Sequence, residues 1–62
     1  MNDKLFRTIL KRYEATIEDA RYKIDIICEQ NLVIPEHIDI TGEIDKLLQI
    51  IAEAEDKVSI MR

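Results

Sequence analysis

The sequence predicts an all-α protein: an antiparallel two-helix hairpin that associates with copies of itself. Three observations predict this fold. Each half of the chain carries an apolar heptad pattern, a short connection with the single proline separates the halves, and there is only one glycine. We expect helices over about residues 3–30 and 36–61, within one helical-hairpin domain that spans residues 1–62.

Apolar residues recur in the first half of the chain at alternating steps of four and three. The positions are Phe6, Leu10, Tyr13, Ile17, Ala20, Ile24 and Ile27. A repeat of 3.5 residues is typical of a helix that packs along one stripe against another helix, and we call this stripe the seam. A strand would alternate with period two, which this segment does not do. Asn2 or Asp3 can cap the start of the helix.

The second half repeats the pattern. Its seam consists of Ile40, Ile44, Leu47, Ile51, Ala54, Val58 and Met61. Pro35 suits the first turn of a helix, and Glu36 complements its positive end. Gly42 weakens this helix by about 1 kcal/mol. It also leaves an alternative open, in which the regular helix starts after residue 39 with Asp39 or Thr41 as its cap. Each expected helix is roughly 40 Å long.

A chain of 62 residues needs more than its own core to be stable. Cys28 is the only cysteine, so no disulfide can form within the chain. Cys28 and His37 are too few ligands for a structural zinc site. Association between copies is therefore the remaining way to stabilise the chain. A lone cysteine fits a reducing compartment, and we find no apolar run that suits a signal peptide or a membrane span, so we expect a cytoplasmic protein.

Further apolar residues lie beside the seams, and they should stay exposed in a single hairpin. They are Leu5, Ile9, Leu48, Ile50 and Ile60. An apolar surface of this width favours a homo-oligomer, most simply two hairpins in a dimeric four-helix bundle with twofold symmetry. The residues expected at the oligomer interface are Phe6, Leu10, Tyr13, Ile17, Ile24, Ile27, Ile44, Leu47, Leu48, Ile51 and Val58.

Charge is unevenly distributed along the chain. The net charge of −4 argues against binding to duplex DNA, yet the segment from Lys4 to Arg12 has four cations and no acid. This segment is either a solvated helix face that favours packing between copies or an anion-binding patch. If two hairpins pair antiparallel, the connection of one lies near the basic start of the other. The residues of such a ligand pocket would be Arg7, Lys11, Arg12, Arg21, Tyr22, Asn31, Glu36 and His37.

No constellation of residues indicates catalysis, a cofactor or a metal. His37 beside Glu36 is more simply a residue that packs or caps the connection, because neighbours on a helix do not face each other. Cys28 is expected to be a small buried apolar residue. Tyr22, between Arg21 and Lys23, is the better candidate for a recognition surface. We therefore expect a protein that is not an enzyme.

Three segments carry a resemblance to a known group. They are Asn31-Leu-Val-Ile-Pro-Glu-His-Ile-Asp39, Gly42-Glu-Ile-Asp-Lys-Leu47 and Ala54-Glu-Asp-Lys57. Together they resemble small helical-hairpin proteins of tailed bacteriophages, a group without an assigned function. The chain departs from that group in the connection, where it lacks glycines and has Ile38 in place of a proline. The resemblance implies a phage accessory protein in the host cytoplasm.

Three functions stay open at this point. The first is an interaction protein that binds or inhibits a host factor. The second is sequestration of an anionic small molecule, such as a nucleotide immune signal, in pockets between subunits. The third is an RNA-binding helical bundle that uses the basic stretch of the first helix.

Overall fold

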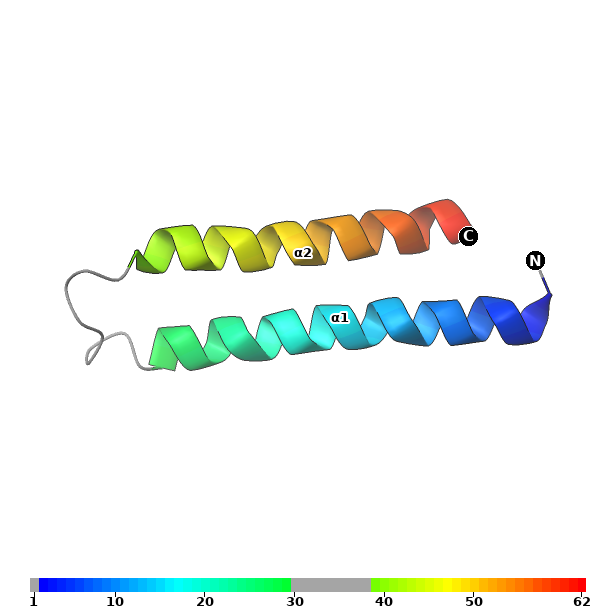
Figure 1. Cartoon of the computed structure of the whole chain (residues 1–62), viewed down its shortest axis with the longest axis horizontal. Coiled ribbons are helices and arrows are strands. Elements are labelled where there is room, and N and C mark those ends of the chain that lie inside the picture. The colour runs from blue at the N-terminus through cyan, green and yellow to red at the C-terminus, as the bar shows by residue number, and fades with distance from the viewer. Residues whose placement is uncertain (1, 30–38) are drawn as a thin grey trace.

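Two long helices lie side by side and run in opposite directions (Figure 1). The computed structural model describes residues 2–29 and 39–62. Helix α1 spans Asp3–Glu29 and helix α2 spans Ile40–Met61, and the two pack against each other. Over these residues, the expected all-helical hairpin is confirmed.

The seams of the two helices form the interior of the hairpin. All fourteen seam residues are buried or half-buried, from Phe6 to Ile27 on α1 and from Ile40 to Met61 on α2. Residues on the remaining faces are mostly exposed. The stripe predicted from the spacing of apolar residues is therefore the stripe along which the helices meet.

A side chain caps the start of α1. The Oδ1 atom of Asn2 accepts a hydrogen bond from the Leu5 N–H at 2.8 Å, and the Asn2 carbonyl accepts from the Phe6 N–H at 2.9 Å. The first bond satisfies a donor that the first turn of a helix otherwise leaves free, and the second is the first i to i−4 backbone bond of the helix. Of the two expected capping residues, Asn2 is the one that caps, and Asp3 is the first helical residue.

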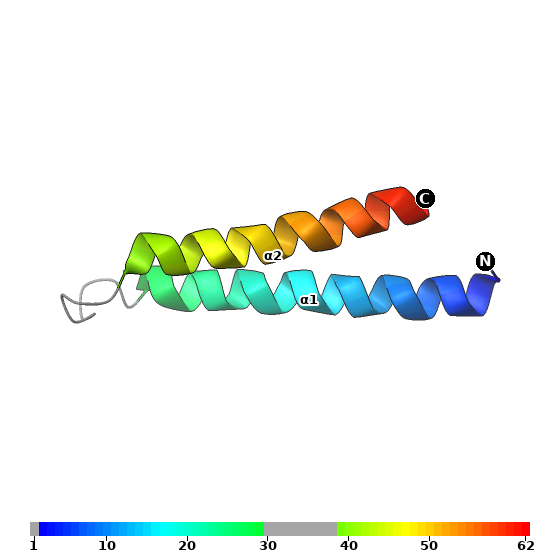
Figure 2. The ribbon, with the colours of Figure 1, turned by 45° about the horizontal axis from the view of Figure 1, so that its top comes forward.

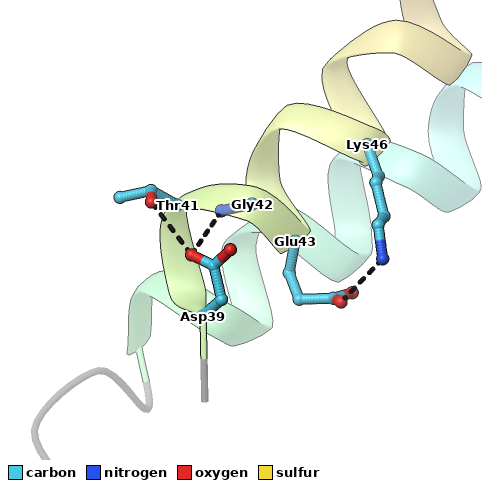
Figure 3. Close-up of polar contacts among 5 residues, drawn as sticks. All are labelled: Asp39, Thr41, Gly42, Glu43 and Lys46. Atoms are coloured by element: carbon cyan, nitrogen blue, oxygen red, sulfur yellow. Dashed lines mark hydrogen bonds and ion pairs between the residues drawn. The ribbon is translucent and has the colours of Figure 1, made fainter. Parts of the chain in front are cut away.

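Helix α2 starts later than the expected residue 36. Asp39 has non-helical backbone angles, with ψ of 87°, and it is the N-cap. Its Oδ1 atom accepts a hydrogen bond from the Gly42 N–H at 2.9 Å and another from the Thr41 hydroxyl at 3.1 Å (Figure 3). The start at residue 36 is therefore wrong and the alternative with Asp39 as the cap is confirmed. The aspartate provides the acceptor that a helix start needs.

The same hydrogen bonds affect the acidity of the cap. The Gly42 N–H, followed by the Thr41 hydroxyl, lowers the pKa of the Asp39 carboxyl below its ordinary value of 3.8. A lowered pKa in the folded state means that the ionised cap stabilises α2 at any pH above about 4. This contribution is lost as the pH falls through the lowered pKa.

Replacing Gly42 by alanine should separate helix propensity from capping. A Cβ at residue 42 would overlap the Asp39 carboxylate, so the cap would have to move. We expect Gly42→Ala to leave the Tm within about 2 °C of the wild type, although propensity alone predicts a gain of about 1 kcal/mol. In an Asp39→Ala background the same substitution should raise the Tm by about 4–8 °C. Thermal unfolding followed by circular dichroism measures both, and a full gain in the wild-type background would contradict this account of the cap.

The hairpin is slender, with Cα extents of 49 × 15 × 12 Å. Helix α1 has 27 residues and α2 has 22, so α1 is longer by roughly 8 Å. The first turns of α1 extend beyond the end of α2, and the last turns of α2 diverge from α1 in the view of Figure 2. Neither described helix combines the length and the apolar character that a membrane crossing requires.

Candidate interaction surface

Each helix buries one alanine in its contact with the other helix. Ala20 is 2% exposed and Ala54 is 3% exposed, and no other residue in the described ranges is fully buried. The next residue on each helix joins an ion pair, in which the Arg21 guanidinium lies 3.5 Å from the Glu55 carboxylate. This contact places the two alanines at the same level of the hairpin. Small side chains at this level allow the helix axes to approach, because the interaxial distance depends on the residues at the contact.

Large apolar side chains remain exposed around this narrow interior. The exposed fractions are 49% for Leu5, 52% for Leu48, 42% for Ile50 and 77% for Ile60, which confirms the expectation for these four residues. The expectation that Ile9 stays exposed is wrong, because Ile9 is half-buried in a hollow between the helices. One hairpin thus leaves a wide apolar surface uncovered.

Two adjoining hollows lie on one side of the hairpin. The first, of about 310 Å³, is lined by Ile9, Tyr13, Lys57, Ile60 and Met61. The second, of about 210 Å³, shares Tyr13 and Lys57 and adds residues from the middle of each helix. The Lys57 Nζ atom sits 5.6 Å from the centroid of the Tyr13 ring, within the range of a cation–π contact. We call this surface the Tyr13 flank and define it by Ile9, Tyr13, Thr16, Ile50, Lys57 and Ile60.

The outer face of α2 is different, because acids surround its apolar residues. An open, shallow hollow there is lined by Asp45, Leu48, Gln49, Ala52, Glu53 and Asp56. The Glu53 carboxylate accepts a hydrogen bond from the Gln49 amide at 3.0 Å. This face combines an exposed leucine with negative charge.

The cations proposed as ligand contacts are exposed but divided between faces of α1. Arg7, Lys11, Arg12, Arg21 and Tyr22 are all exposed. Arg7 and Lys11 are four residues apart and share one face, whereas Arg12 lines the second hollow of the Tyr13 flank. Arg21 is already paired with Glu55. The other proposed contacts, Asn31, Glu36 and His37, lie outside the described residues.

Cys28 is exposed, so the expectation that it is buried is wrong. It follows the seam residue Ile27, and one step along a helix turns the side chain by about 100°, away from the contact between the helices. Of the residues expected at the oligomer interface, Leu48 is exposed and the others are half-buried within the hairpin itself. Their part in an oligomer stays a prediction.

Tyr13, Thr16 and Lys57 form the polar part of the flank, and sequence reasoning did not bring them together. Lys57 and Thr16 were not candidates, and Tyr13 was expected as a residue of the seam and of the oligomer interface. Within the ranges 2–29 and 39–62, no group of three or more His, Cys, Asp or Glu side chains could hold a metal ion. No protein-family model matches the chain, and comparisons with curated proteins and with solved structures likewise find no match.

Proposed function

We propose that this chain is a non-enzymatic interaction protein that pairs with a second copy in a four-helix bundle and binds another protein as a bundle. One observation carries the proposal. The described residues bury only Ala20 and Ala54, while aliphatic side chains such as Ile50 and Ile60 stay largely exposed. Contiguous apolar surface of this kind is typical of a protein–protein interface.

The exposed area supports pairing with a second copy. The chain exposes 5205 Å². A compact monomer of its 7.3 kDa mass would expose about 4,200 Å². The difference, about 1,000 Å², exceeds the roughly 800 Å² that each partner buries in a standard stable interface. The surplus area is therefore enough for a standard interface with a second hairpin.

The placement of the cations favours protein interaction over the sequestration of an anion. Arg7 and Arg12 are five residues apart, so their side chains leave α1 at an angle of about 140° to each other. The Arg21 guanidinium is engaged by the Glu55 carboxylate. No single face of a described helix gathers these cations around a pocket, and an anion site would depend on residues from another copy.

The outer face of α2 is the surface that we propose for a heterologous partner. Its exposed Leu48 lies between Asp45 and Asp56, which suits a partner with a basic rim and an apolar recess. Because the chain resembles hairpin proteins of phages, we propose that the partner is a host factor and that the bundle binds or inhibits it.

Native mass spectrometry of freshly purified protein tests this proposal, because it records the subunit number and any retained ligand together. We expect an assembly of twice 7.3 kDa without additional mass. An oligomer that retains a small anionic molecule would support sequestration in place of protein interaction. A folded monomer would contradict the pairing.

A further inference from the structure

The two sides of the hairpin differ in chemistry. On one side the Arg21–Glu55 ion pair joins the helices. A helix turns by about 100° per residue, so Arg21 lies about 140° around α1 from Thr16. Glu55 likewise lies about 140° around α2 from Ile50. The ion pair is therefore on a different side of the hairpin from Thr16 and Ile50. The other side is the Tyr13 flank, where aliphatic residues from both helices surround Tyr13 and Lys57. The exposed residues Ile50 and Ile60 therefore share one side of the hairpin, whereas Leu48 lies on the outer face of α2.

The second hollow of the flank lies near the middle of both helices. Its lining includes Thr16, at the midpoint of α1, and Ile50, close to the midpoint of α2. A twofold axis through this hollow would keep two antiparallel hairpins in contact over most of their length. An axis near either end would leave much of each flank uncovered.

Charges in this hollow are complementary under such an axis. Arg12, Glu53 and Lys57 all line it. Neither Arg12 nor Lys57 forms an ion pair with any residue in the described ranges. A twofold axis through this hollow brings the hollows of the two copies face to face, so that the Glu53 carboxylate of one copy can approach a cation of the other. Like charges facing each other would disfavour the pairing, whereas this arrangement alternates the signs.

We propose that the Tyr13 flank is the surface on which a second copy of this chain docks, antiparallel, about a twofold axis that passes between Thr16 and Ile50. This assignment rests on the self-association proposed above and specifies its site. The aliphatic residues Ile9, Ile50 and Ile60 supply the apolar contact. Arg12, Lys57 and Glu53 fix the register of one hairpin against the other.

A matched pair of substitutions on α2 tests the apolar part of this interface. Ile50 and Leu48 are both exposed and two residues apart, so they lie about 200° apart around the helix. We expect Ile50→Glu to weaken the dimer by more than about 100-fold, because the interface would bury a carboxylate in place of an apolar side chain, and its desolvation costs more than an ion pair with Arg12 or Lys57 returns. We expect Leu48→Glu to change its affinity by less than about threefold, as for an exposed surface substitution. Sedimentation equilibrium measures both, and circular dichroism verifies that each variant stays helical.

Cross-linking tests the position of the axis. In a Cys28→Ser background, Thr16→Cys should form covalent dimers with a short bismaleimide linker. The control, Glu18→Cys, lies two residues away on the opposite side of α1 and should not. If the wild type is dimeric but Leu48→Glu dissociates it and Ile50→Glu does not, the flank assignment fails and self-association stands. If the wild type is monomeric, the flank assignment and the proposed self-association are both contradicted.

Discussion

A rise of about 100-fold in protein concentration is expected to raise the Tm by roughly 10 °C. The reason is mass action, because a paired bundle unfolds into two chains and higher concentration favours the paired state. Over this range the paired state gains about 2.7 kcal/mol of free energy relative to the unfolded chains. The shift in Tm is this gain divided by the unfolding entropy, which scales with the number of residues in two chains. Differential scanning calorimetry at several concentrations measures the shift.

The Ile50→Glu variant provides the control for this experiment. If the variant is monomeric, its Tm should be independent of concentration and lower than that of the wild type at every concentration. A wild-type Tm that does not change with concentration would contradict self-association, whatever the exposed area of the hairpin.

Ala54→Leu is expected to destabilise the protein by about 1–3 kcal/mol. Ala54 is 3% exposed in the contact between the helices, next to the residue that pairs with Arg21. A leucine at this position adds three carbon atoms and has to push the helices apart or adopt a strained rotamer. Urea unfolding at one fixed protein concentration measures the change in the free energy of unfolding.

Ala52→Leu is the matched control, because Ala52 lies on the same helix and is exposed. We expect a change within about 0.5 kcal/mol there. If Ala54→Leu stabilises the protein as much as a heptad leucine does in a coiled coil, then the small side chains of Ala20 and Ala54 do not determine the spacing of the helices.

The helices and their contact could be predicted well from the sequence. Every position with 4-3 spacing from Phe6 to Met61 is buried or half-buried, because a helix with this repeat presents one stripe to its neighbour. The start of α2 was harder. Pro35 is a strong signal for a first turn, but the carboxylate of Asp39 and the N–H of Gly42 form the cap that begins the regular helix.

The candidate surface could be predicted only in part. Spacing identified Leu5, Leu48, Ile50 and Ile60 as apolar residues outside the seams, and all four are exposed. It could not show that Ile9 and Ile60 line one hollow, since that depends on how the two helices are aligned. A signal was available: Ile9, Thr16, Ile50 and Lys57 each directly precede a seam residue, which places them on the same side of their helices.

Small-angle X-ray scattering combined with light scattering tests the central claim most directly, because it gives the mass and the shape of the same sample. Two hairpins paired side by side predict a mass of twice 7.3 kDa with a radius of gyration close to the 14.9 Å of one hairpin. An end-to-end dimer would have the same mass and a much larger radius. A mass of 7.3 kDa at every concentration would contradict the proposal that this protein functions as a paired bundle.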